Sequence, residues 1–442
     1  MTDLMFAIAF VAPFLMWIAW SRISGRPVLR VSCSTVVFLG YIAANHVGLA
    51  WLYFSGRGHF SIERFDPAVL IQLAVYSWIV TGAFIFADLM WATSPRPFEG
   101  GPARLTPPRG ALFWIVVVAA VCLPVAIVRA MSDSPLMLLL NGDPVAANLA
   151  RVEGVSSGDS FLGIKPQYLE IPFTVLEYGS VYLLAIALMT RRYRWLVPWA
   201  MLVMVYSLDS FSSLSKGFVL IPIMSVWFTW GLVRERGRLI TAKMIPFFGG
   251  VTLVVAGFAA WVLGQSELSI FFPVERILLG NLIPQYFVVS AFNAENILLG
   301  ASAPGWMSLG LHDQFLLDVF AWRGLMGGTE DLFYTAPSSF VAEGYANFLD
   351  LGVVFFSVVA FQGLAIVDHL IGKVRGDLTY CALLVFSCIH FSRLSRSGLV
   401  NFVVDYHFWG VLIFALWGAR LAFVAGRSLG ARDERLAAQG IE

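Results

Sequence analysis

Long apolar runs constrain this chain more than any other feature of its sequence. Stretches of roughly 20 residues with very few charges recur along its 442 residues. A helix of that length crosses the ~30 Å hydrocarbon core of a bilayer. Because lipid supplies no hydrogen-bond partner for the backbone, such runs are expected to be helical. The sequence therefore predicts an all-α, polytopic membrane protein, with residues 1–442 forming a single integral membrane domain.

Eleven apolar spans are expected from the pattern. Their approximate limits are 4–20, 31–54, 68–92, 111–131, 173–190, 195–208, 218–233, 244–264, 351–371, 378–391 and 401–424. Lys and Arg concentrate in every second loop, and the side that carries more of them is normally cytoplasmic. This bias places the N-terminus outside and the C-terminus inside.

Two long segments then face outwards, loop A (132–172) and loop B (265–350). Long segments on one face of a protein often carry its function. Within loop B, ILLGNLIPQYFVV and DQFLLDVFAW are predicted to form amphipathic helices that rest on the bundle or on the membrane interface.

Composition excludes some classes of function. Only 13% of the residues are charged and the net charge is +1, so no basic domain exists to bind nucleic acid. The four cysteines lie inside apolar runs, which favours small buried side chains over a disulfide or zinc framework. No His-rich or HExxH pattern is present. We therefore expect no metal and no other cofactor.

Cations on the outer side are the first candidates for chemistry, because the positive-inside bias works against them. They are Arg151, Lys165, Lys216, Arg276, Arg393 and Arg396. Such residues can be ordinary surface cations, or can extend to lipid headgroups. Alternatively they bind an anionic ligand such as a phosphate, for which the planar fork of Arg offers two parallel donors. Lys216 follows three serines and precedes a glycine at an expected helix start, where free N–H groups already favour anions.

A carboxylate is the second candidate. Outer carboxylates include Glu153, Glu170 and Glu343, and transfer of a glycosyl or acyl group requires a general base. Glu343 is the preferred one, because Tyr345 and Asn347 follow it closely at the start of an apolar run. A half-buried carboxylate beside apolar residues is suited to proton transfer. The alternative is that Glu343 caps a helix or pairs with an Arg, and only holds loop B in place.

Three stretches carry a resemblance to a known family. SSFVAEGYANFLDLG resembles the pattern E-x-Y-x-N-F-G-x-x-G of Wzy-type oligosaccharide repeat-unit polymerases, which build O-antigen and exopolysaccharide in bacteria. Glu343, Tyr345, Asn347, Phe348 and Gly352 match that pattern, whereas Leu349 stands where the family has Gly. SSLSKGFVLIP and NLARVEGVSSGDSFLG resemble two further segments of the same family, a turn that opens a middle span and the first outer loop.

The resemblance implies a GT-C-like fold and a glycosyltransferase of the bacterial inner membrane. Its substrates would be oligosaccharides on undecaprenyl diphosphate, joined at the periplasmic face. Arg151 and Arg276 would act in catalysis with Glu343, and Lys216, Arg393, Arg396, Lys165, Tyr345, Asn347 and Glu170 would bind substrate. Membrane lipid and a chain-length regulator of the polysaccharide co-polymerase type would be its partners.

Three other functions stay open. An O-antigen ligase would use the same donor with a lipid A-core acceptor, and its sequence would look alike. A transporter or flippase normally places ionisable groups at mid-membrane on broken helices, whereas here the polar positions concentrate on one face. A non-catalytic scaffold of an assembly machine is the third alternative.

Overall fold

The computed structural model describes residues 2–27, 29–55, 62–91, 109–131, 134–143, 166–212, 217–244, 278–304, 313–325, 338–374 and 377–404, with a few single positions between them. Within these residues the chain is helical and no strand is present, only one isolated bridge between Arg30 and Arg238. The described part of the chain is therefore consistent with the helical membrane protein that its apolar runs predict.

Helices account for nearly all of the described chain. Their bounds are α1 Thr2–Ser24, α2 Cys33–Tyr41, η1 Ile42–His46, α3 Val47–Ser55, α4 Pro67–Trp91, α5 Arg109–Met131, α6 Pro135–Leu140, α8 Pro166–Thr190, η3 Tyr193–Trp195, α9 Leu196–Ser212, α10 Gly217–Val233, η4 Ala242–Met244, α13 Leu282–Ala291, α14 Leu317–Leu325, α15 Phe340–Gly372, α16 Asp377–Phe391, η5 Ser392–Arg396 and α17 Leu399–Val404.

Six of these helical stretches are long and apolar enough to cross a membrane. They cover Thr2–Ser24, Cys33–Ser55, Pro67–Trp91, Pro172–Thr190, Phe340–Gly372 and Asp377–Arg396. Shorter apolar helices cover Ile115–Ala130, Val219–Val233 and Leu282–Ala291. The expected spans 244–264 and 401–424 lie mostly outside the described residues, so the total of eleven stays a prediction.

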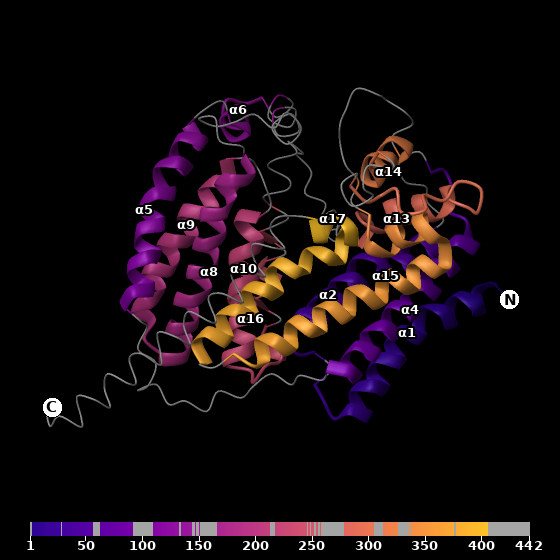
Figure 1. Cartoon of the computed structure of the whole chain (residues 1–442), viewed down its shortest axis with the longest axis horizontal. Coiled ribbons are helices and arrows are strands. Elements are labelled where there is room, and N and C mark those ends of the chain that lie inside the picture. Colours follow the sequence, from indigo (N-terminus) through magenta and orange to yellow (C-terminus); the bar gives the residue numbers. More distant parts are fainter. Residues whose placement is uncertain are drawn as a thin grey trace, which may run out of the picture.

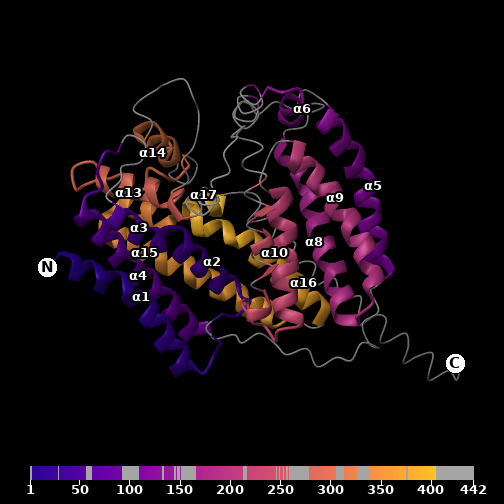
Figure 2. The same cartoon turned by 180° about the vertical axis from the view of Figure 1, so that it is seen from behind.

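The helices form two groups, with α16 between them (Figures 1 and 2). One group contains α5, α8, α9 and α10, and the other contains α1, α2, α3, α4, α13 and α15. α16 contacts α8 and α10 on one side and α2 and α15 on the other. α6 of loop A and α13 and α14 of loop B lie at the same end of the molecule, at the top of Figure 1. Residues 29–31 are also paired with 237–239, which follow α10.

Loop B differs from a simple outer loop in two ways. First, α15 begins at Phe340, well before the predicted limit of 351, because Ser339 caps the helix and its side chain accepts a hydrogen bond from the Ala342 amide. Second, α13 is not a surface helix: most of its residues are buried, including the polar Gln285, which accepts a hydrogen bond from the Ser339 hydroxyl at 2.7 Å. Both α13 and the end of loop B, from Ser339 onwards, are therefore part of the packed bundle.

Candidate active site at the kink of α15

The kink in α15 creates the candidate site. Phe348 and Leu349 have non-helical backbone angles, and Leu349 has φ 52° and ψ −139°. An opening segment (340–347) and a long segment (350–372) meet there at two glycines. A Cβ on Gly344 would lie only 2.5 Å from the Gly352 carbonyl oxygen. The positive φ falls on Leu349, where the resembled motif has Gly, and this backbone region disfavours residues with a Cβ.

Glu343 is buried inside this arrangement, with 2% of its surface exposed. Its Oε1 accepts a hydrogen bond from the Ser302 hydroxyl at 3.2 Å, and its Oε2 accepts one from the Val400 amide at 3.0 Å. The Leu399 amide donates to the same carboxylate. These two amides are the first of α17, so Glu343 supplies acceptors that the first turn of a helix lacks. A Cβ on Gly398 would lie 2.9 Å from Oε2, so any larger residue there would displace the carboxylate.

Asn347 lies one turn after Glu343 and is also fully buried. Its Nδ2 donates to Ser302 Oγ and to the Glu343 carbonyl oxygen, both at 2.8 Å. Its Oδ1 accepts from the Gly300 amide at 2.9 Å. Backbone hydrogen bonds from Leu298 and Leu299 to the end of the opening segment run beside these contacts. The polar residues of the motif therefore hold residues 298–302 against α15.

Arg393 and Arg396 lie on η5, just before the loop that contacts Glu343. η5 is anchored to the bundle by Asn45, whose Nδ2 donates to the Ser395 carbonyl oxygen at 3.0 Å. Arg396 is exposed and Arg393 is half-buried. Neither of them forms an ion pair with a described residue. Arg393 and Arg396 precede Gly398 by a few residues in sequence, and the structure places Gly398 against the Glu343 carboxylate.

Tyr345 lies elsewhere. Its ring is buried and packs against the ring of Tyr76 on α4, with centroids 5.8 Å apart. The Tyr76 hydroxyl in turn donates to Asp350. Positions two apart on a helix point in different directions, so Tyr345 cannot share a site face with Glu343 in the way that Asn347 does.

The other predicted site residues are not placed. Arg151, Lys165, Lys216 and Arg276 lie outside the described residues. Glu170 belongs to the start of α8, but its side chain also lies outside the described part. Their roles stay predictions.

Two features near the site were not expected from the sequence. Asp318 on α14 accepts hydrogen bonds from the Ser338 amide and hydroxyl at 3.0 and 2.7 Å, and it acts electrostatically on Glu343. Burial raises the pKa of Asp318, although both hydrogen bonds oppose this shift. The local sequence offers no signal for this contact, because α14 and α15 are brought together only by the fold.

The second feature is a contact between His390 Nε2 on α16 and Glu177 Oε2 on α8, at 3.0 Å. His390 lies three residues before Arg393. The sequence places both residues near the outer ends of spans, but it does not indicate that they contact each other. The contact extends the polar positions from η5 towards the group formed by α5, α8, α9 and α10.

Within the described part of the chain no group of three or more His, Cys, Asp or Glu side chains is arranged to hold a metal ion. All four cysteines are buried and free, as predicted. No protein-family model, curated protein or solved structure matches the chain.

Proposed function

We propose that the chain is a bacterial inner-membrane glycosyltransferase that joins oligosaccharide repeat units carried on undecaprenyl diphosphate, at the periplasmic face. The observation that carries this proposal is the junction of α15, η5 and α17. There a buried carboxylate, Glu343, lies beside a segment that presents two cations, Arg393 and Arg396, without ion-pair partners among the described residues. A carboxylate base and fixed cations are what transfer from a diphosphate to a hydroxyl requires.

The reaction assigns a role to each group. The acceptor sugar hydroxyl attacks the anomeric carbon of the donor, and the bond from that carbon to the diphosphate oxygen breaks. Glu343 takes the hydroxyl proton. The departing diphosphate gains negative charge, which Arg393 and Arg396 stabilise together with Arg151, Lys216 and Arg276 of the outer loops.

Access to Glu343 requires a movement. At 2% exposure the carboxylate cannot touch a sugar while Ser302 and the Leu399 and Val400 amides surround it. In our proposal the Gly398–Val400 segment withdraws when substrate binds, and the acceptor hydroxyl replaces its amides as the hydrogen-bond donor. The same contacts hold the site closed when substrate is absent.

The deciding experiment combines purified protein with undecaprenyl-diphosphate-linked repeat units and separates the products on a gel. We expect a ladder of polymers. Single additions to a supplied lipid A-core acceptor would identify a ligase instead. If neither product forms, the glycosyltransferase proposal is wrong, and a transporter or a scaffold takes its place.

A pair of variants tests the cation role in the same assay. Arg396→Gln should slow polymerisation about a hundredfold, the usual cost of losing one donor to a developing anion. Arg323→Gln is the matched control, because Arg323 is an exposed cation at the end of α14 and forms no ion pair with a described residue. Equal rates for the two variants would remove η5 from the site.

A further inference from the structure

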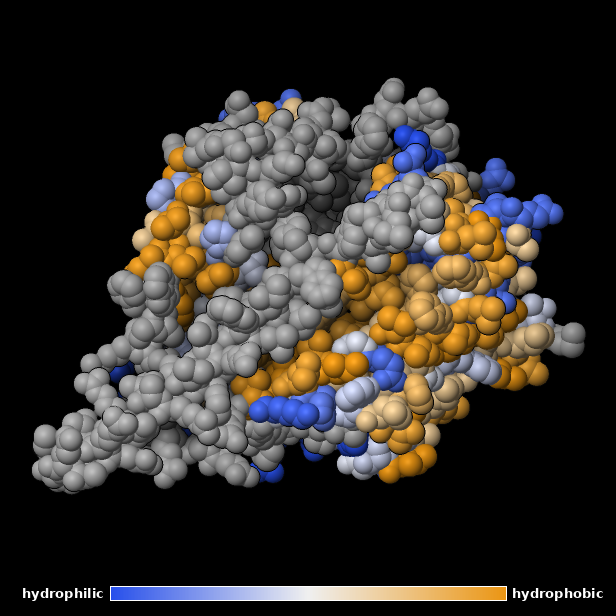
Figure 3. All heavy atoms as spheres, viewed as in Figure 1, coloured by the Kyte–Doolittle hydropathy of each residue, from blue (hydrophilic) through white to orange (hydrophobic). Residues whose placement is uncertain are grey.

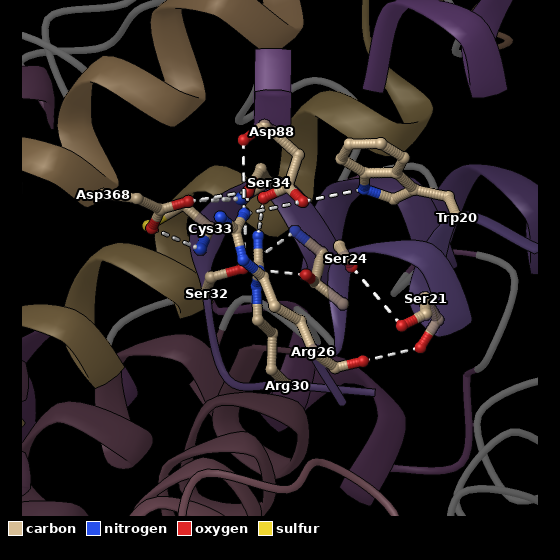
Figure 4. Close-up of polar contacts among 11 residues, drawn as sticks. Trp20, Ser21, Ser24, Arg26, Arg30, Ser32, Cys33, Ser34, Asp88 and Asp368 are labelled. Carbon is tan, nitrogen blue, oxygen red and sulfur yellow. Dashed lines mark hydrogen bonds and ion pairs between the residues drawn. The ribbon is translucent and has the colours of Figure 1, made fainter. Parts of the chain in front are cut away.

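A second polar cluster lies far from Glu343, where α1 and α4 end and α2 begins. It lines a small cleft that opens to the surface. Trp17, Trp20, Ser21, Ser24 and Thr35 are among its lining residues, with Arg26, Arg30 and Asp88 at its centre. Figure 4 shows both arginines converging on Asp88. By the loop charges, this end of the molecule is predicted to be cytoplasmic.

The cluster holds more positive than negative charge. Asp88 is the acceptor for both guanidinium groups: Arg30 Nη2 pairs with Oδ1, and Arg26 Nη1 lies 3.0 Å from Oδ2. Trp20 Nε1 also donates to Oδ2 at 2.8 Å. The carboxylate of Asp368 on α15 is occupied by the Cys33 and Ser34 amides. Among the described residues, one carboxylate thus serves two arginines, which leaves an excess of one positive charge.

Arg30 adds an independent sign of a ligand. Only 4% of its surface is exposed, yet its buried Nε has no hydrogen-bond partner in the part of the chain that the structure describes. Leaving such a buried donor unsatisfied is unfavourable. The backbone on either side of Arg30 is fixed by the pairing of Leu29 and Val31 with residues 237–239, so the side chain is held in place. Arg26 is 23% exposed at its side chain and contacts Asp88 through Nη1, which leaves the rest of its fork available.

The surroundings of the cleft are apolar. On α1 Ile18 and Ile23 are exposed, and on α4 Phe86, Leu89 and Met90 are exposed. Figure 3 shows apolar side chains spread over the side of the molecule formed by α1, α4 and α15. In a membrane protein such a surface meets acyl chains. A ligand that binds the cationic cleft and also covers the apolar surface must therefore be amphiphilic, with an anionic head and an apolar tail.

We infer that this cleft binds the headgroup phosphate of an anionic glycerophospholipid, with its acyl chains against α1 and α4. Arg26 donates to the phosphate from the mouth of the cleft, and Arg30 adds a second guanidinium group to the lining. Tryptophans and arginines at the end of an apolar span are suited to the headgroup level, and basic pockets between helices on the cytoplasmic side recognise such heads.

The test is a lipid titration of the purified protein in neutral detergent, followed by native mass spectrometry. Phosphatidylglycerol is the probe and phosphatidylcholine is the zwitterionic comparison. We expect one phosphatidylglycerol molecule to bind more tightly than the others, and Arg26→Gln to weaken its binding about tenfold, the loss of one charge-assisted contact. Arg22→Gln is the matched control: Arg22 is an exposed cation one turn earlier on α1 that does not line the cleft.

Two results would overturn the inference: equal affinity for both lipids, or equal affinity of wild type and Arg26→Gln for phosphatidylglycerol. A competition arm separates the two sources of phosphate. If millimolar inorganic phosphate displaces the tightly bound lipid from wild type, the site recognises free phosphate, and the lipid assignment is wrong. If Arg26→Gln does not accumulate, Arg26→Lys replaces it. That variant keeps the charge but loses the fork, so it should bind phosphatidylglycerol more weakly than wild type and more tightly than phosphatidylcholine.

Discussion

Glu343 has two roles, and a single substitution can separate them. Its carboxylate accepts hydrogen bonds from the Leu399 and Val400 amides at the start of α17, and in our proposal it also accepts a proton. Glutamine preserves the first role, because its carbonyl oxygen can face the amides while its NH₂ group donates to Ser302 Oγ, whose hydroxyl rotates to accept. Only the basicity is lost.

We therefore predict that Glu343→Gln accumulates in the membrane but polymerises about 10²-fold more slowly or worse. Ser302→Ala is the control in the same assay: it removes one hydrogen bond to the carboxylate and leaves the base, so only a few-fold loss is expected. Normal polymerisation by Glu343→Gln would exclude this residue as the base, and Glu170 would be tested next. Failure to accumulate would favour the purely structural role.

Leu349 carries backbone strain at the kink. A residue with a Cβ at φ 52° and ψ −139° is disfavoured by about 1–3 kcal/mol. Leu349→Gly relieves this strain but also loses the packing of a half-buried leucine. Comparing Leu349→Gly with Leu349→Ala cancels the packing loss, because both variants lack the side chain. We predict that the glycine variant unfolds at the higher temperature, the reverse of the usual order in helices. The opposite order would show that the kink imposes no strain.

Among the elements, α2 depends on a cap supplied from far along the chain. The Cys33 and Ser34 amides donate to the Asp368 carboxylate of α15 at 2.8 and 3.0 Å, and the Ser34 hydroxyl donates to it at 2.7 Å (Figure 4). The positive end of the helix dipole also favours this charge. The contact joins the first helices to the last ones at the end of the bundle opposite the candidate site.

Removal of this charge should be costly. Asp368→Asn leaves one amide donor facing an NH₂ group, so we predict a loss of about 2 kcal/mol in the free energy of unfolding. Asp377→Asn is the matched control, since Asp377 lies in the first turn of its own helix, α16, where a carboxylate contributes about 0.5 kcal/mol. Thermal unfolding followed with a thiol-reactive dye measures both, because all four cysteines are buried until the protein unfolds. Equal shifts would contradict the tertiary cap.

At the scale of the whole molecule, both candidate sites depend on orientation. Loops A and B are predicted to face outside, with the loop 93–110 inside, since Lys and Arg alternate between the two sides. In a protein cleared of its native cysteines, Ser157→Cys and Thr329→Cys should react with a membrane-impermeant maleimide from outside. Thr93→Cys should react only after permeabilisation. The reverse pattern would invert the molecule, and would place the Glu343 site and the lipid cleft on the wrong leaflets.

The sequence by itself determined the class of structure and the limits of most helices. Apolar length decides whether a helix can span a bilayer, and this property is local, so spans such as 68–92 and 173–190 agree closely with Pro67–Trp91 and Pro172–Thr190. The cysteines lie buried for the same reason. The sequence also indicated that Glu343, Tyr345 and Asn347 cluster at the start of an apolar run.

Tertiary structure decided what each polar side chain contacts. Glu343 contacts Gly398 and also accepts a hydrogen bond from Val400, which lies 57 residues later in the sequence. Asp368 accepts a hydrogen bond from Ser34, which is 334 residues away. Such partners depend on which helix ends are adjacent in the bundle, and hydrophobic periodicity does not encode adjacency. Tyr345 illustrates the difference: the motif places it beside Glu343 in sequence, but the helix turns it towards Tyr76. At the kink near Leu349, Gly344 and Gly352 likewise lie in close contact, and this contact joins two segments of α15.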